Sequence, residues 1–382
     1  PPGASVSDLV SDAVAAPAGR FFLPGPTEVR PAVLAAMLRP MMPHRGRAFE
    51  ALFERLQAGL RAVFRTTRPV LVSTSSATGL MEAAVRCAPA GPVLALVNGA
   101  FAERFAQLAR ACDRETDVLE TPWGAAPDLD AVARRLAARR YAAVTVVHSE
   151  TSTGVLTDVR AVTALARHHG ARCLVDSVTG IAGAPLEFDA WELDFALTGS
   201  QKALALPPGL AFAAASADFM DAVRRDAPAG RGLYFDLVEM EAFAARHQTP
   251  NTPALPLLYA LEAQLAAIAA EGIEARWRRH AAMAETVVRW VETAGGPRAG
   301  LGILAPPGAR SPTVTALTLP PTLTGDAVVA AMAERGYTIG NGYGKLKGAS
   351  VRIGHMGDHT VAGLAGCLDA LADVLPSSPP AG

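Results

Sequence analysis

The sequence lacks three features that would place the chain in a membrane or on nucleic acid. No apolar run approaches the roughly 18–20 residues that a membrane-spanning helix requires. Residues 1–20 are interrupted by Asp and Pro and have no basic start, unlike a signal peptide. Lys and Arg number 35 against 36 Asp and Glu, so the net charge of -1 leaves no basic excess for binding phosphates. We therefore expect a soluble protein with neither a membrane nor a nucleic-acid partner.

Cysteine is also scarce. The four cysteines lie far apart, and no two have the CxxC spacing of a zinc site or redox pair. They are Cys87, Cys112, Cys173 and Cys367. Isolated cysteines are typical of the reducing cytoplasm, where they act as small buried apolar side chains. We expect a cytoplasmic protein without a disulfide framework and without a metal site.

Two phosphate-binding signatures are missing as well. The chain contains neither GxGxxG nor GxxxxGK[ST]. The segment GNGYGKL at 340–346 comes near, but the spacing before Lys345 is wrong and no Ser or Thr follows it. An NAD-dependent oxidoreductase, the generic interpretation of an α/β chain, is therefore a poor candidate.

The chain does show a repeated alternation of strands and helices. Of its 382 residues, 50% are hydrophobic and 19% are charged, which is enough apolar material for a large core. Short apolar runs bounded by Gly, Pro, Ser or Asn predict buried strands at 69–72, 92–98, 142–148, 171–177, 194–200 and 209–216. Helices are predicted among them at 76–87, 128–140 and 157–169. This alternation indicates an α/β domain with a mostly parallel sheet between helices.

The pattern changes after about residue 250. A long helical stretch with a turn at 271–273 is followed by a Gly/Pro-rich stretch and a small set of strands and helices. The predicted elements are helices at 256–294, at 326–335 and from His359 onward, and strands at 313–319 and 350–354. We expect an N-terminal extension (1–20), a large α/β domain (21–265) and a smaller C-terminal α+β domain (266–382) that ends in a frayed tail from Pro376.

Lys202 and Asp176 each stand at the end of a strand that should be buried. Parallel strands bring their carboxyl ends to one edge of the sheet, where α/β proteins bind ligands. A desolvated lysine amine there loses its proton readily and can form a Schiff base. A carboxylate there can keep a pyridinium nitrogen protonated. The simpler alternatives are a surface lysine in a loop and an aspartate that caps the next helix.

Two further segments have the residues to bind anions. At 73–83, STSSATGLMEA predicts a strand, a Ser/Thr-rich turn and a helix, whose first N–H groups and the hydroxyls of Ser76 and Thr78 suit a phosphate. An ordinary helix N-cap is the alternative. Arg352, in the predicted strand 350–354, carries a guanidinium that suits a carboxylate, or else makes an internal salt bridge. The nearby His355 has a weaker claim to a role.

The order of these features, phosphate turn, aspartate, lysine and arginine, resembles the class V aminotransferases of the pyridoxal phosphate fold type I superfamily. The likeness is greatest to the alanine–glyoxylate and serine–glyoxylate (or serine–pyruvate) aminotransferases, and it covers nearly everything after residue 20. The resemblance rests on the segments FFLPGPTEVRPAVLAAM (21–37), HRG (44–46), SSATGLMEA (75–83), NGAFAERF (98–105), SETSTGVL (149–156), LVDSVTGIAG (174–183), TGSQKALALPPGL (198–210), TPNTPALPLLYAL (249–261) and VRIGHMG (351–357).

The resemblance implies a place for each matching residue around the cofactor pyridoxal 5'-phosphate. Lys202 would form the Schiff base and move the proton between Cα and C4′, and Asp176 would contact the pyridine nitrogen. Phe101 and Val178 would pack on the two faces of the ring, and Thr151 would approach the ring hydroxyl. The residues implied at the phosphate are Ser76, Ala77, Thr78, Gln201 and, from the neighbouring subunit, Thr252.

The resemblance also implies the reaction. Arg352 would bind the α-carboxylate of the substrate, and Gly25 would bring main chain close to it. Arg45, in HRG, would bind a second acidic group or pair with an acid at the interface. The expected activity is ping-pong transfer of an amino group from alanine or serine to glyoxylate or pyruvate, in a homodimer whose subunits share their active sites.

Departures from the family pattern leave alternatives open. SSAT stands where relatives commonly have SGxG or SGT, so Ala77 adds a Cβ to the phosphate turn, and Thr249 stands where some relatives carry a Tyr. RIGHMG also occurs in relatives that act on amines such as pyridoxamine, so an amine transaminase or a lyase with the same cofactor is the main alternative. A cysteine desulfurase is a poorer one, because Cys367 lies in a predicted helix. A scaffold that has lost its activity would have lost the lysine, the aspartate or the arginine.

Overall fold

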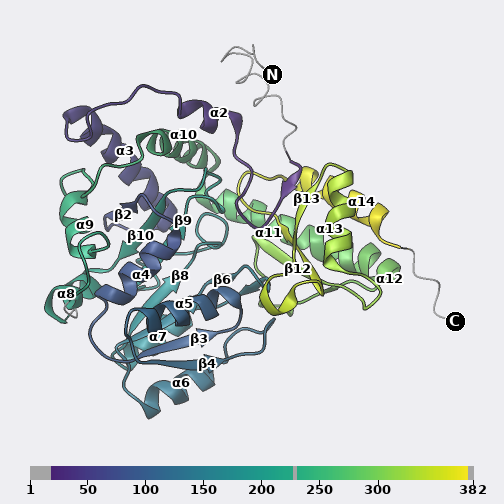
Figure 1. The fold of residues 1–382 in the computed structure, drawn as a ribbon, viewed down its shortest axis with the longest axis horizontal. Coiled ribbons are helices and arrows are strands. Elements are labelled where there is room, and N and C mark those ends of the chain that lie inside the picture. Colours follow the sequence, from purple (N-terminus) through teal and green to yellow (C-terminus); the bar gives the residue numbers. More distant parts are fainter. Residues whose placement is uncertain (1–18, 227–229, 377–382) are drawn as a thin grey trace.

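The computed structural model describes residues 19–226 and 230–376 (Figure 1). The N-terminal extension expected at 1–20 lies outside the described residues up to residue 18, and so does the C-terminal tail from residue 377. Two sheets of different size, each with its own hydrophobic core, organise the chain. In Figure 1 the larger sheet and its helices lie on the left and the smaller sheet lies on the right.

The larger sheet has seven strands and confirms the mostly parallel α/β arrangement expected from the sequence. Its strands, in spatial order, are β2 (Val70–Ser73), β10 (Ala211–Ala215), β9 (Phe195–Gly199), β8 (Arg172–Asp176), β5 (Ala143–Val147), β3 (Val93–Val97) and β4 (Thr116–Glu120). Within this sheet β10 runs antiparallel to both of its neighbours, and the other pairs are parallel. All of the strands predicted for this part of the chain are present, and β4 is additional.

Helices cover the larger sheet and supply much of its core. They are α2 (Pro31–Ala36), α3 (Arg47–Phe64), α4 (Ala77–Cys87), α5 (Ala100–Ala111), α6 (Leu129–Ala138), α7 (Val159–His168), α8 (Ala217–Asp226), α9 (Leu237–Ala244) and α10 (Leu255–Glu271). A short hairpin, β6 (Ser149–Glu150) and β7 (Val155–Leu156), follows β5. The amphipathic α3 shows why these helices pack: Phe49, Leu52, Leu56 and Leu60 repeat every three or four residues and are fully buried.

The smaller sheet has five strands and forms the expected α+β unit. Its strands, in spatial order, are β1 (Phe21–Phe22), β13 (Thr338–Asn341), β14 (Ser350–Gly354), β12 (Val314–Thr318) and β11 (Gly302–Ile303). The accompanying helices are α11 (Ile273–Trp290), the π-helical η1 (Val291–Gly295), α12 (Gly296–Ala299), α13 (Gly325–Glu334), the 3₁₀ turn η2 (Gly344–Leu346) and α14 (Val361–Val374). The predicted helical stretch 256–294 is divided at Gly272 into α10 and α11, at the expected turn.

No single point in the sequence separates the strands of the larger sheet from those of the smaller one. The first strand, β1, pairs in parallel with β13 of the smaller sheet, although it comes before the whole of the larger one. The boundary expected after residue 265 falls within the continuous helix α10. The division into parts at 20 and 265 stays a prediction.

The carboxyl ends of β2, β3, β8 and β9 meet at one edge of the larger sheet, as parallel pairing requires. The helix that follows β2, α4, is held at its far end by Arg114. This guanidinium is buried, and it donates hydrogen bonds to the carbonyl oxygens of Val85 (3.1 Å), Ala88 (3.1 Å) and Gly91 (3.0 Å). These bonds satisfy carbonyls that the end of a helix leaves unpaired.

We expect Arg114→Ala to lower the free energy of unfolding by about 3 kcal/mol, because several charge-assisted hydrogen bonds to buried carbonyls are lost together. Urea unfolding followed by circular dichroism measures this loss. The matched control is Arg110→Ala, which removes an exposed guanidinium from the same region and should change the free energy by less than about 0.5 kcal/mol. Equal losses in the two variants would show that Arg114 does not stabilise the end of α4.

Candidate active site

A cavity of about 160 Å³ lies at the carboxyl edge of the larger sheet, at the junction of several βα loops. Nine of the residues predicted from the sequence line it, although they come from five separate segments of the chain. They are Ser76, Ala77, Thr78, Phe101, Thr151, Asp176, Val178, Gln201 and Lys202. The structure thus brings together residues that the resemblance had assigned to one cofactor.

Lys202 is buried rather than a surface loop lysine, with 8% of its surface exposed. Its Nζ donates to the carbonyl oxygen of Pro24. The pKa of Lys202 is lowered to about 8, chiefly by burial and also by the nearby Arg352, while Asp176 and Glu150 act in the opposite direction. The neutral form of the Lys202 amine, which a nucleophile or a proton acceptor requires, is therefore well populated at mildly alkaline pH, far below the usual range of a lysine.

Asp176, at the end of β8, is 4% exposed and lines the same cavity. Its Oδ1 accepts a hydrogen bond from the backbone N–H of Val178 at 2.9 Å. The pKa of Asp176 is raised to about 7, chiefly by burial and also by Glu150, while the Val178 N–H and Lys202 act in the opposite direction. Such a carboxyl group gains from a cationic partner in the cavity, because that partner would offset its lost hydration.

Gly25 lies directly against Lys202. A Cβ built on Gly25 would come 2.4 Å from Nζ of Lys202, and the backbone has φ of +98°, where a side chain is strained. The expectation that Gly25 brings main chain close to the substrate stays a prediction. The observed neighbour is the lysine side chain.

The phosphate turn expected at Ser76, Ala77 and Thr78 forms the start of α4. Ser76 occupies the N-cap position but makes no side-chain capping bond, so its hydroxyl is not used to cap its own helix. The first N–H groups of a helix have no partner within that helix and attract anions. Ala77 lies in the regular helix, outside the residues with positive φ, so the turn tolerates its methyl group.

Glu150 is a buried acid that sequence reasoning missed. Its Oε2 accepts hydrogen bonds from the N–H groups of Phe101 (3.1 Å) and Ala102 (3.0 Å), at the start of α5. Its Oε1 accepts from the N–H (3.0 Å) and the hydroxyl (2.6 Å) of Ser152. Burial raises the pKa of Glu150, while these hydrogen bonds lower it. Glu150 takes the place of a capping side chain, because the N-cap residue Gly99 has none.

Arg352 projects from β14 of the smaller sheet and is 9% exposed. It donates to the carbonyl oxygens of Asn341 (2.9 Å) and Thr151 (3.3 Å). Among the described residues it forms no ion pair with a carboxylate, so the internal salt bridge considered above is not found there. Burial lowers the pKa of Arg352, and Tyr343 and Glu150 partly offset this effect.

Tyr343 is a second residue that sequence reasoning missed. Its ring stacks on Phe101, with centroids 5.4 Å apart and planes inclined by 16°, and the Arg352 guanidinium carbon lies 5.4 Å from the same ring. It therefore joins two residues of expected function across the two sheets. The signal lay in GNGYGKL, which draws attention as a glycine-rich loop but contributes an aromatic side chain.

Three other expected residues lie away from the cavity. Thr252 is exposed. It lines a separate depression together with Tyr234 and the rest of the segment 249–253. The Arg45 guanidinium donates to the carbonyl oxygens of Thr249 (2.7 Å) and Pro250 (2.9 Å), so it holds that segment. His355 is buried, with Nε2 2.9 Å from the Thr315 hydroxyl, and does not line the cavity.

Known proteins resemble this chain over most of its length. An uncharacterized aminotransferase of Methanocaldococcus jannaschii is 34% identical over 88% of this chain and 87% of its own length. A serine–glyoxylate aminotransferase of Arabidopsis thaliana is 32% identical over 93% of this chain and 90% of its own. The crystal structure of an alanine–glyoxylate aminotransferase from Nostoc sp. superposes with a TM-score of 0.87 and 31% identity, covering 93% of this chain and 95% of the other.

The family described as "Aminotransferase class-V" matches residues 26–343, which include every cavity residue named above. The match covers the whole of the larger sheet and β11, β12 and β13 of the smaller one, and the fold agrees with that of the solved aminotransferase. Together with the buried lysine and aspartate at the sheet edge, these similarities establish that the chain belongs to the class V aminotransferases, enzymes that use pyridoxal phosphate.

Proposed function

We propose that the protein transfers an amino group from a small amino acid, alanine or serine, to a small 2-oxo acid, glyoxylate or pyruvate, in a ping-pong reaction. The observation that carries this proposal is the burial of Lys202 and Asp176 in one cavity beside Arg352. The names of the Arabidopsis and Nostoc relatives support the choice of small substrates.

The residues of the cavity fit pyridoxal phosphate. The start of α4, with its unpaired N–H groups and the free hydroxyl of Ser76, suits the phosphate. Asp176 is a buried carboxylate that suits a ring nitrogen, and Thr151 suits the ring hydroxyl. Phe101 and Val178 provide apolar surface for the ring. When bound, the cofactor supplies an electron sink that stabilises negative charge at the substrate Cα.

Each protein group then has a defined task. Lys202 would hold the cofactor through Nζ, and as a neutral amine it would also accept the proton from the substrate Cα. Asp176 would keep the ring nitrogen protonated. Arg352 binds the α-carboxylate and so fixes the Cα within reach of Lys202. Tyr343 stacks on Phe101 and so supports the ring that would pack against the cofactor.

We also propose that the enzyme is a homodimer in which Thr252 reaches the cofactor phosphate of the neighbouring subunit. Thr252 is exposed and does not line the cavity of its own subunit. Both properties are expected of a residue that contacts the active site of a partner subunit. Exposed apolar side chains support an interface, since such side chains are costly when left in water. They are Leu34, Leu38, Met41, Leu233 and Tyr234.

The proposed location is the cytoplasm. Cys87, Cys112, Cys173 and Cys367 are all free thiols in the structure, as the reducing cytoplasm maintains them. Among the described residues, no helix combines the length and the apolar character needed to cross a membrane.

Substitution of the lysine tests the assignment directly. Lys202→Ala should remove turnover and the near-visible band of the bound cofactor, while the unfolding transition stays close to that of the wild type. Lys345→Ala, which removes an exposed lysine paired with Glu103, should change none of these. In the wild type, L-alanine or L-serine should bleach the band and release a 2-oxo acid. If pyridoxamine alone bleached the band, the protein would be an amine transaminase. If the reaction released ammonia, the protein would be a lyase.

The acidity of Lys202 gives a pH-dependent prediction. In the full chain freed of cofactor, reductive methylation by formaldehyde and cyanoborohydride requires the neutral amine. Because the pKa of Lys202 is lowered to about 8, its methylation should rise with pH through 8 and then level off. The pKa of Lys345 is raised by its hydrogen bond to Glu103, so the methylation of Lys345 should still be increasing above pH 10. Peptide mass spectrometry measures methylation at Lys202 and Lys345 separately. Equal methylation midpoints for the two lysines would contradict the lowered pKa of Lys202.

Arg352→Gln should lower kcat/KM for L-alanine about 30-fold to 100-fold, because a charge-assisted contact to the carboxylate is lost. The near-visible band of the cofactor bound to Lys202 does not depend on a substrate carboxylate, so its intensity should be nearly unaffected and serves as the internal control. Loss of this band together with kcat/KM would show that Arg352 maintains the site as a whole and does not bind the carboxylate.

A further inference from the structure

We propose that Arg276 is a positioning residue that fixes the turn carrying Lys202, residues 201–205, which we call the lysine turn. With Asp358, it connects this turn to the loop 355–359 that follows β14, the strand of Arg352. The inference rests on the proposed role of Lys202 and adds a residue outside the cavity to the catalytic arrangement.

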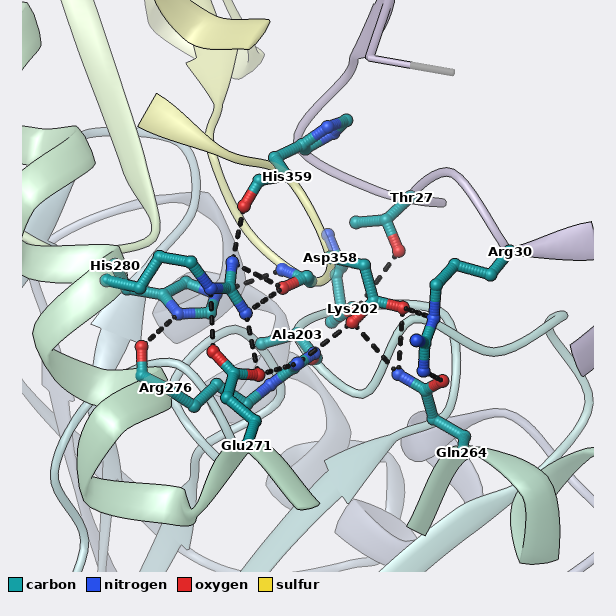
Figure 2. A network of polar contacts seen from close by, with 12 residues as sticks. Thr27, Arg30, Lys202, Ala203, Gln264, Glu271, Arg276, His280, Asp358 and His359 are labelled. Carbon is teal, nitrogen blue, oxygen red and sulfur yellow. Dashed lines mark hydrogen bonds and ion pairs between the residues drawn. The ribbon is translucent and has the colours of Figure 1, made fainter. Parts of the chain in front are cut away.

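Arg276 lies on α11 with its side chain 1% exposed, although it carries a permanent charge. Its Nη1 pairs with Glu271 and Asp358, each at 2.9 Å, and its Nη2 donates to the carbonyl oxygen of Ala203 at 2.8 Å (Figure 2). A buried guanidinium is costly unless such partners surround it. The contact to Ala203 is the one that reaches the active-site segment.

The backbone of the lysine turn is held from outside at three successive carbonyls. Thr27 donates from its N–H to the carbonyl of Gln201 (3.0 Å) and from its hydroxyl to that of Lys202 (3.0 Å). Arg276 donates to the next carbonyl, that of Ala203. Because both sides of Lys202 are bonded, the direction in which its side chain leaves the backbone is defined.

The turn also contains backbone strain that needs external support. Ala205 has φ of +53°, a conformation that residues with a Cβ adopt at a cost. Gly357 of the loop 355–359 packs against it, so closely that a Cβ on Gly357 would lie 3.1 Å from the Cβ of Ala205. Hydrogen bonds hold this glycine: its N–H donates to Nε2 of His280 at 3.0 Å, and its carbonyl accepts from Arg279 at 3.2 Å.

Asp358 is the point where separate segments meet. Besides Arg276, its carboxylate accepts from Nε of Arg30 (2.7 Å), at the start of α2, and from Nε2 of Gln264 (3.1 Å), on α10. In Figure 2 these side chains converge on Asp358 from different ribbons. The guanidinium of Arg276 therefore links the lysine turn to the loop that begins one residue after β14, and so couples the positions of Lys202 and Arg352.

Arg276 acts through position and not through its charge on the amine. The low pKa of Lys202 arises from burial and from Arg352, with Asp176 and Glu150 opposing it, and Arg276 is not among its causes. Loss of the Ala203 contact should therefore change Lys202 by letting the turn move and admitting water to the amine.

The test uses Arg276→Gln in the full chain, with Arg278→Gln as the matched control. Arg278 is an exposed arginine on the same helix. Without cofactor, the methylation midpoint of Lys202 should rise by roughly 0.5 pH unit or more in Arg276→Gln, because the amine regains water. The assay is clean because Lys202, Lys345 and Lys347 are the only lysines of the sequence. With cofactor, kcat for L-alanine should fall about 10-fold at nearly constant KM.

A double variant, Arg276→Gln with Asp358→Asn, separates positioning from charge balance. Removing both charges should recover part of any lost thermal stability, since the carboxylate that had lost one of its two cationic partners is gone, although Arg30 then loses its pairing with Asp358. The methylation midpoint and kcat should stay altered, because the Ala203 carbonyl is still unbound. If Arg276→Gln alone does not fold, the double variant is assessed by the same two measurements.

Two outcomes would overturn the proposal. The first is an Arg276→Gln protein with the wild-type methylation midpoint of Lys202 and the wild-type kcat. The second is a double variant in which both values return to those of the wild type, which would show that Arg276 only balances the charge of Asp358. Failure of the proposed function is recognised separately, by turnover in Lys202→Ala. The midpoint is measured without turnover and still reports on Arg276 in that case.

Discussion

The removal of Lys202 and Asp176 from water is the constraint on which the rest of the structure depends. Each group loses hydration when buried, and the loss shifts both pKa values toward neutrality, to about 8 and about 7. Glu150 and Arg352 lie close enough to act on one or both of them. Several ionisable groups thus share one desolvated space, in which Lys202 and Asp176 can exchange protons at moderate cost. This is the condition that acid–base chemistry at neutral pH requires.

The fold maintains this cavity mainly with main-chain dipoles. The first N–H groups of α5 bind Glu150, the N–H of Val178 binds Asp176, and the carbonyls of the lysine turn accept from Thr27 and Arg276. Parallel strands make this arrangement possible, because their carboxyl ends and the following helix starts collect at one edge. The charged side chains that hold the site therefore come from distant segments, whereas the catalytic ones come from strand ends.

Much of this could be predicted from the sequence. The buried strands are continuous apolar runs, so the residues that follow them, such as Asp176 and Lys202, could be assigned to the sheet edge. Strand β4 escaped prediction because its residues, TDVLE, are partly exposed and include acids, and so give no apolar run. Glu150, Tyr343 and Arg276 escaped for another reason: their partners lie far away in the sequence, and no local pattern marks such a pair.

The position of β1 has a consequence for how the protein is made. Phe21 and Phe22 emerge from the ribosome early, but they pair with Thr338 and Ile339, which are synthesised more than three hundred residues later. The segment between β1 and α2 carries the Pro24 carbonyl that Lys202 contacts and the Thr27 that holds the lysine turn. The seven-stranded sheet can form as soon as its own strands exist. Its active site is completed only when almost the entire chain has been translated, because in a product that ends before β13 the segment 21–27 is present but has no partner strand to anchor it.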